Sequence, residues 1–209
     1  MKKTIVLLAL LGSAGLVCAQ GNNFYAIGGI GQSNVKLKDE AGPVLVDLGA
    51  TGVSSSVDKK DTAWKLGVGY QLSPNFAVEA GYVALGKVSN KARGTGGADT
   101  ANAEYKSSAL GLSALGMLPI NTDFSVFAKA GVAHTKITAK ADLTVGGASA
   151  SDSAKKREFV PVFGLGAEYK LTQAVAVRAE YERYFKVGDK NTTGESDVDF
   201  LSLGVKVGF

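Results

Sequence analysis

Charged residues at alternate positions of apolar segments are the part of this sequence best able to do chemistry. The stretch Val177-Arg-Ala-Glu-Tyr-Glu182 shows the pattern, because each charged residue alternates with an apolar or aromatic one. Ionisable groups that point into a narrow interior can lock it through ion pairs, or can pass ions by exchanging partners. Four basic and four acidic side chains share one parity: Lys65, Lys129, Arg178, Lys206, Glu79, Glu168, Glu180 and Glu182.

A β-strand turns successive side chains to opposite faces, so these charges would share the inner face of a barrel. A small barrel has room inside for side chains and little else, and we therefore expect a hydrogen-bonded plug. A narrow ion path, gated by re-pairing of the charges, is the alternative. If the strands pair through the repeated hairpins, Lys65 would lie diagonal to Glu79, and Arg178 diagonal to Glu168.

Signals for catalysis are weak in this chain. His134 is the only histidine, and no serine stands within its local reach to form a nucleophile pair. The segment Gly111-Leu-Ser-Ala-Leu115 lacks the last glycine of a Gly-x-Ser-x-Gly elbow and lies in a strand pattern. With one histidine and one cysteine a transition-metal cluster is unsupported. We expect no enzyme, no cofactor and no metal site; a lipid-modifying barrel enzyme is the less favoured alternative.

The last eleven residues show how such charges would be positioned. Leu201, Leu203, Val205, Val207 and Phe209 alternate with small or polar residues. One face of this strand would therefore meet lipid and the other a polar interior. Because unpaired backbone groups in lipid cost several kcal/mol each, the strand requires a closed barrel.

An internal repeat organises the rest of the chain. Residues 70–82 and 169–181 match in length and in their Tyr, Leu, Ala, Val, Ala and Tyr positions, and 118–130 is a third, looser copy. Each copy is typical of a strand end, a short polar turn and a returning strand. Three short turns are thus expected on one side of the molecule.

Long polar segments separate the repeated units and predict four mobile loops on the opposite side, at 34–61, 87–104, 135–157 and 186–197. Short turns facing the periplasm and long loops facing outward are typical of outer-membrane barrels. The sequence therefore predicts an all-β fold, an eight-stranded antiparallel up-and-down transmembrane β-barrel. Its strands are expected at 24–33, 62–71, 76–86, 105–117, 124–134, 158–169, 174–185 and 198–209.

Aromatic residues fall near the ends of the predicted strands, where two membrane interfaces would hold them. We expect Phe24, Tyr70, Phe76, Phe124, Tyr169 and Phe209 at the turn side. We expect Trp64, Tyr82, Tyr181 and Tyr184 nearer the loop side.

The N-terminus predicts export from the cytoplasm. Lys2 and Lys3 precede a short apolar run that ends near Ala19, so residues 1–19 are typical of a secretory signal peptide and 20–209 would form one barrel domain. Cys18 would leave with the signal, and Val17 before it argues against a lipoprotein signal. The formal net charge of +4 is scattered along the chain, which gives no reason to expect nucleic acid as a partner.

The sequence resembles the transmembrane domain of the OmpA-type outer-membrane β-barrel superfamily. The resemblance rests on the segments 78–82, 166–169, 177–181 and 201–205 and covers nearly all of residues 20–209. It implies an eight-stranded barrel in the bacterial outer membrane, with an interior acid/base network onto which Glu79, Glu168 and Arg178 map. It also implies that Phe209 serves as an assembly signal read by the outer-membrane assembly machinery.

Two features depart from that family. Leu115 stands where the family's best-known member has an interior lysine in its fourth strand, so an identical charge-switching gate is not expected. The peptidoglycan-binding domain common in OmpA-type proteins is absent from the sequence, so wall anchoring is not expected either.

We therefore expect a non-enzymatic, monomeric barrel with a structural or surface role, a charge-plugged lumen and loops outside the cell. A low-conductance channel remains the main alternative. Outer-membrane lipid would surround it, and a cationic rim would suit the anionic headgroups of lipopolysaccharide. The candidate rim residues are Lys155, Lys156, Arg157, Arg183 and Lys186.

Overall fold

The structure is a computed structural model, and it describes most of the chain that follows the predicted signal peptide. The prediction for residues 1–19 lies outside the described residues. Within the described part, no helix is both long and apolar enough to cross a bilayer. The described residues are 23–35, 44, 46–48, 53–58, 60–94, 99–189 and 194–209.

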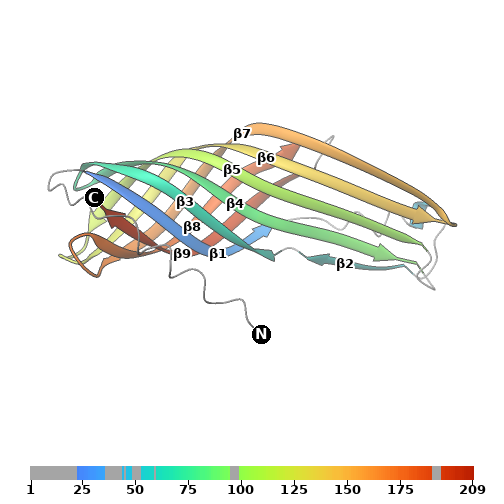
Figure 1. The fold of residues 1–209 in the computed structure, drawn as a ribbon, viewed down its shortest axis with the longest axis horizontal. Coiled ribbons are helices and arrows are strands. Elements are labelled where there is room, and N and C mark those ends of the chain that lie inside the picture. The colour runs from blue at the N-terminus through green and yellow to red at the C-terminus, as the bar shows by residue number, and fades with distance from the viewer. Residues whose placement is uncertain are drawn as a thin grey trace.

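The described chain forms one closed antiparallel sheet (Figure 1). Closure comes from two pairings, because β1 pairs with β9 and β4 pairs with β5. β2 and β3 pair with successive parts of β4 and together occupy one strand position in the barrel. The nine strands therefore form an eight-stranded barrel, which confirms the prediction. The strands are β1 (Phe24–Val35), β2 (Ser54–Asp58), β3 (Lys60–Ser73), β4 (Phe76–Arg93), β5 (Thr100–Pro119), β6 (Phe124–Val145), β7 (Ala148–Lys170), β8 (Val175–Asp189) and β9 (Gly194–Gly208).

Three short turns join strands at one end of the barrel, which we call the turn end. They lie between β3 and β4, β5 and β6, and β7 and β8. In the second turn, the side-chain oxygen Oδ1 of Asn121 accepts hydrogen bonds from the backbone N–H groups of Asp123 (3.0 Å) and Phe124 (2.7 Å). The hydroxyl of Thr172 does the same in the third turn. Asn and Thr stabilise tight turns by such local hydrogen bonds.

The strands at the opposite end, the loop end, are much longer than the sequence predicted (Figure 1). The predicted loops at 87–104 and 135–157 are wrong, because most of their residues belong to paired strands. β6 and β7 are joined by Gly146 and Gly147 alone, whose φ angles of 58° and 84° suit glycine. β8 and β9 likewise extend into the predicted loop at 186–197, while much of 34–61 lies outside the described residues.

Small buried side chains explain the missed strands. Ala92 is 0% exposed and Ala101 is 7% exposed, and Val53, Leu143 and Val145 pack against them. Two alanines fill the narrow interior there, so the segments lack the alternating large apolar residues that identify a strand in a sequence. The Gly, Ser and Thr content of these segments is typical of loops, which explains the wrong prediction.

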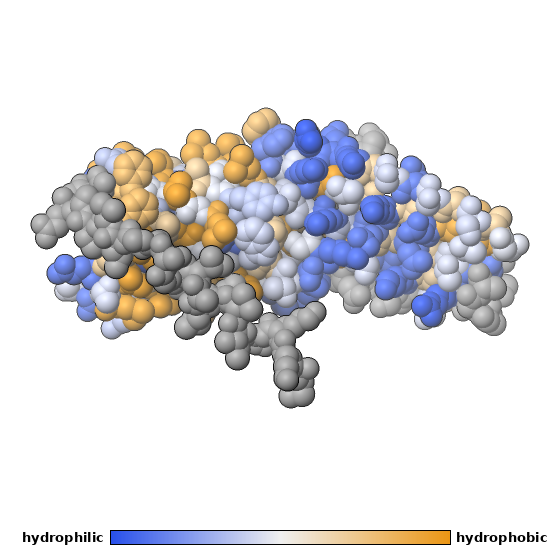
Figure 2. Space-filling view, in the orientation of Figure 1, coloured by the Kyte–Doolittle hydropathy of each residue, from blue (hydrophilic) through white to orange (hydrophobic). Residues whose placement is uncertain are grey.

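The outer surface divides along the barrel axis. Figure 2 shows apolar residues gathered toward the turn end and polar ones toward the loop end. Aromatic pairs stand at both borders of the apolar belt: the rings of Phe24 and Tyr70 are 4.7 Å apart, and those of Trp64 and Tyr82 are 5.5 Å apart. The prediction for Tyr184 is wrong. Its side chain is 3% exposed and points inward, as its parity with the charged residues of β8 requires.

Candidate functional site

The interior of the barrel has an ordered sequence of layers along its axis. On β4, inward Ala77 is followed by Glu79 and then by Val83, so an apolar position precedes and follows the charged one. On β6, Phe127 likewise precedes Lys129. The charged residues therefore lie between two apolar layers. The layer toward the turn end contains Tyr25, Ile27, Ala77, Leu115, Met117 and Phe127.

The second apolar layer closes over the charges toward the loop end. Phe200 is 0% exposed, Leu85 2% and Tyr184 3%, so these side chains fill the interior there. Tyr184 is the next inward residue of β8 after the charged ones, so the inward face of this strand changes there from charged to largely apolar. The full layer contains Ala63, Val83, Leu85, Ala109, Ala133, Ile137, Val160, Val162, Tyr184, Val187, Val198 and Phe200.

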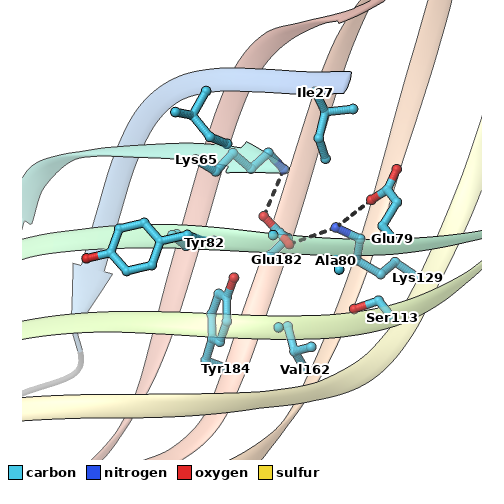
Figure 3. Close-up of a pocket in the computed structure, with 14 residues that line it drawn as sticks. Ile27, Lys65, Glu79, Ala80, Tyr82, Ser113, Lys129, Val162, Glu182 and Tyr184 are labelled. Carbon is cyan, nitrogen blue, oxygen red and sulfur yellow. Dashed lines mark hydrogen bonds and ion pairs between the residues drawn. The ribbon is translucent and has the colours of Figure 1, made fainter. Parts of the chain in front are cut away.

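Lys129 contacts three carboxylates of the charged layer, and Figure 3 shows it between Glu79 and Glu182. Its ammonium nitrogen Nζ is 3.2 Å from a carboxylate oxygen of Glu79, 2.7 Å from Glu180 and 3.0 Å from Glu182. The ammonium of Lys65 contacts Glu180 at 2.6 Å and Glu182 at 2.9 Å. Two lysines and two glutamates thus form a closed square of ion pairs, to which Glu79 is attached.

Arg178 joins this square to the remaining charges. Its guanidinium is 2.5 Å from Glu79, 2.9 Å from Glu180 and 3.4 Å from Glu168. Glu168 in turn is 3.1 Å from the ammonium of Lys206. All eight predicted residues therefore lie in one connected set of contacts, in which four positive charges balance four negative ones.

Aromatic side chains attach the network to the turn-end layer. The hydroxyl of Tyr25 donates a hydrogen bond of 2.9 Å to Glu79. The guanidinium of Arg178 lies 4.1 Å from the ring centre of Phe127, and the ammonium of Lys206 lies 4.2 Å from that of Tyr25. A cation over an aromatic face is attracted by the electron-rich ring, more strongly where water is excluded.

Nearly all of these charges are withdrawn from water. The side chains of Lys65, Lys129, Arg178 and Glu180 are between 1% and 7% exposed. Removing an ion from water costs several kcal/mol, so a charge buried this deeply is tolerated only when it is paired and hydrogen-bonded. A void of about 30 Å³ lies beside Lys65, and it could hold one or two water molecules.

The cross-strand arrangement differs from both of the diagonal pairs expected from the sequence. Arg178 lies directly opposite Glu168 in the β7–β8 register, not diagonal to it. Glu79 faces Gly69, four positions from Lys65, so the Lys65–Glu79 pair is wrong. Lys65 instead reaches across the interior to β8, because a closed barrel brings opposite walls within side-chain reach.

Leu115 and Lys129 account for the departure from the family pattern. Leu115 points inward and is 1% exposed, and it faces Lys129 directly across the β5–β6 pair. The positive charge that the family's best-known member has on its fourth strand is therefore supplied here by Lys129 of the neighbouring strand, β6. The inward aromatics Tyr25, Phe127 and Phe200 were missed by the sequence reasoning, although their parity with nearby charged residues could have found them.

The five candidate rim residues do not form one patch. Lys155 and Arg157 point outward from β7 and are exposed, whereas Lys156 between them has the opposite parity and is partly buried. Arg183 points outward from β8, where its guanidinium contacts Asp199 of β9 at 2.5 Å. Lys186 is exposed and has a φ angle of 52°, at an irregular point of the β8–β9 pairing.

His134 and Phe209 lie on the outside of the barrel, so their side chains do not join the charged network of the interior. The ring of His134 packs on that of Phe159, with centres 4.8 Å apart. Phe209 is 47% exposed at the turn end, and its backbone N–H donates a hydrogen bond of 3.1 Å to the carbonyl of Phe24.

Comparison with known proteins places this geometry in a family. The chain matches the OmpA-like transmembrane domain over residues 19–209. It belongs to this family. Outer membrane protein A of Shigella flexneri is 35% identical over 142 residues, which are 68% of this chain and 38% of that protein. Outer membrane protein A of Yersinia pseudotuberculosis is 30% identical over 216 residues, 100% of this chain and 56% of that protein. The chain therefore spans only part of the length of its curated relatives.

Solved structures show the same fold. Neisserial surface protein A has a TM-score of 0.56 and 16% identity, with 90% of this chain and 97% of that chain covered. The outer membrane protease OmpT from Escherichia coli has a TM-score of 0.50 and 12% identity, with the same coverage. Members of this OmpA-like family are outer-membrane proteins, and the chain is an outer-membrane β-barrel protein.

Proposed function

We propose that this barrel is a non-enzymatic, structural protein of the outer membrane whose interior is closed to ions. The layered interior carries the proposal: a neutral, fully paired set of charges lies between two layers of apolar side chains. An ion that crossed would have to displace Phe200 and Leu85 and then break several buried ion pairs. Each of these steps is costly in an interior from which water is excluded.

The proposal places the turn end in the periplasm and the loop end outside the cell. Short periplasmic turns and longer external connections are the usual arrangement of outer-membrane barrels. The long β6–β7 hairpin would then stand above the bilayer, where it could present a surface to the environment.

No catalytic step is part of this proposal. His134, the single histidine of the sequence, lies against Phe159 on the outer face and is separated by the barrel wall from the buried carboxylates. The fold alone does not decide the question, because the protease OmpT shares it. A hydrolase would be detected as turnover of phospholipid or of a peptide by the purified barrel, lost in His134→Ala.

Conductance across planar lipid bilayers tests the closed interior. The purified barrel should give no discrete current steps, and Arg178→Ala should stay silent as well, because Phe200 and Leu85 still fill the loop-end layer. Lys87→Ala, on the outer face, is the matched control for loss of one basic side chain.

Two outcomes would contradict this reasoning in different ways. Steady currents through the unmodified barrel would make it a narrow channel, the second candidate function. Currents through Arg178→Ala alone would show that the ion pairs form the gate by themselves and that the apolar layers do not block ions.

A further inference from the structure

A contiguous group of basic side chains lies on the outer face of β4 to β7. Lys87 faces Lys106 directly across β4 and β5, and Lys136 faces Arg157 directly across β6 and β7. Lys106 faces Thr138, which is two residues from Lys136 on the same face of β6. We call Lys87, Lys106, Lys136 and Arg157 the outer basic patch. All four side chains are exposed.

This arrangement is unfavourable for the barrel alone, because like charges directly opposite each other in a sheet are destabilising. Lys87 has an acidic partner, Glu104, at 2.6 Å. Among the residues that the structure describes, Lys106, Lys136 and Arg157 form no ion pair. The patch thus has two directly opposed basic pairs and only one acidic partner, Glu104. A bound anion would reduce the repulsion between its basic side chains.

The outer basic patch stands at the border of the apolar belt. Two residues from Lys136 toward the turn end, a row of outward side chains runs across three strands: Leu110, His134 and Phe159. Leu110 is 60% exposed and Phe159 is 77% exposed. Large apolar side chains this exposed belong in lipid, so the patch lies at headgroup level. Figure 2 shows polar residues beginning where the apolar part of the surface ends.

A hollow of about 630 Å³ opens on the same outer face toward the turn end. Its floor is made of small residues on β5 and β6, and larger side chains stand at its edges. Lys136 and Ala130 are six residues apart, roughly 20 Å along a strand and about 14 Å along the membrane normal at a tilt of roughly 45°. One leaflet is roughly 15 Å thick, so the hollow lies at the depth of acyl chains. Outward side chains around it are Phe76, Ala114, Gly116, Ala128, Ala130, Phe163, Leu165, Tyr181, Arg183 and Phe185, and the guanidinium of Arg183 is paired with Asp199.

We propose that the outer basic patch and this hollow together bind one phosphorylated, acylated glycolipid of the outer leaflet, the lipid A class. Its phosphates would pair with Lys106, Lys136 and Arg157, and an acyl chain would lie in the hollow. One molecule can supply both the phosphate and the acyl chain, because the basic and apolar regions are one leaflet apart on the same strands. In the cell, the assignment rests on the proposed orientation, with the loop end outside.

The test compares lipid A binding by the purified barrel in phosphatidylcholine nanodiscs. The patch variant Lys106→Gln, Lys136→Gln, Arg157→Gln should lose about 100-fold in apparent lipid A affinity, since each basic side chain near an anionic headgroup contributes about a fivefold factor. Without lipid A, the same variant should unfold at an equal or higher urea concentration than the unmodified barrel, because the opposed like charges are gone.

The matched control removes the same number of charges farther from the belt. Lys91→Gln, Arg93→Gln, Lys140→Gln, all at exposed outward positions, should keep the affinity within about threefold. Equal losses in both variants would show a general attraction of charges and would overturn the site. So would an unchanged affinity in the patch variant, or inorganic phosphate that competes fully with lipid A. Orientation plays no part in this measurement, so its failure is separate from a failure of the proposed function.

Discussion

Replacing Arg178 by methionine tests whether the buried charges act as one unit. Methionine keeps much of the side-chain volume beside Phe127 but removes the positive charge. Arg178 contacts Glu79 at 2.5 Å, Glu180 at 2.9 Å and Glu168 at 3.4 Å, so its loss leaves the interior one negative charge in excess. Breaking a buried pair typically costs ~3 to 5 kcal/mol.

The companion change is Glu79→Gln, which keeps an oxygen that can accept the hydrogen bond from Tyr25. Alone it leaves one positive charge in excess, and we expect a loss of similar size. Together, Arg178→Met and Glu79→Gln restore neutrality, so the double variant should be more stable than the sum of the single losses predicts, by ~1 to 3 kcal/mol.

Urea unfolding in phosphatidylcholine vesicles, followed by the heat-modifiable shift of the folded barrel on gels, measures these free energies. Lys87→Met is the control. The pair of Lys87 with Glu104, at 2.6 Å, is nearly as short as the 2.5 Å contact of Arg178 with Glu79, but the side chain of Lys87 is 52% exposed. Exposed pairs contribute at most ~1 kcal/mol. Additive losses for Arg178 and Glu79, or a loss for Lys87→Met as large as for Arg178→Met, would refute the idea of a coupled, buried network.

Three further outcomes are expected. Ser149→Cys, at the tip of the β6–β7 hairpin, should react with a membrane-impermeant maleimide on intact cells while Gln173→Cys, in a short turn, should not; the reverse pattern would invert the orientation. Gly31→Ala should lower the free energy of unfolding by ~1 to 3 kcal/mol, because its Cβ would lie 2.6 Å from a backbone atom of β9, whereas Gly116→Ala, with nothing within 4 Å, should change it by less than ~0.5 kcal/mol. Phe209→Ala should reduce the amount of folded barrel in cells but not refolding in detergent; an unchanged cellular yield would exclude the assembly signal.

The period of two in the sequence predicted the barrel and the inward side of the eight charged residues. It could not predict their partners. Lys65 and Glu180 are 115 positions apart and meet across the interior, which depends on how the whole sheet closes. The sequence does suggest which residues pair within one hairpin, but among the ion pairs between strands in the buried network this accounts only for the contact of Glu168 with Arg178.

Two kinds of residue escaped prediction for a different reason. Tyr184 points inward although an aromatic residue near a strand end is typical of a lipid interface, and Phe200, for which no position was predicted, points inward as well. The long strands past the belt were missed because the fully buried side chains there are small, Ala92 and Ala101, with Val53, Leu143 and Val145 only partly buried against them. The hydrophobic signal of a strand weakens wherever its inner face needs only small side chains.

The position of the charged network also bears on how the barrel folds. Glu79 and Arg178 are 99 residues apart, and Lys65 and Glu182 are 117 apart, so these contacts cannot form within a single hairpin. Contacts between residues so distant in the chain carry a large entropic cost and form slowly. These two contacts, which join the first half of the chain to β8, should therefore form late, when the barrel closes.

Until that moment Lys65 and Glu79 lack their partners on β8, and an inner face with unpaired charges is repelled by hydrocarbon. A half-formed sheet would consequently stay at the bilayer surface, with its charges in water, and would enter the membrane only as β1 pairs with β9. The network that stabilises the finished barrel would in this way also couple insertion to closure and disfavour the insertion of an incomplete one.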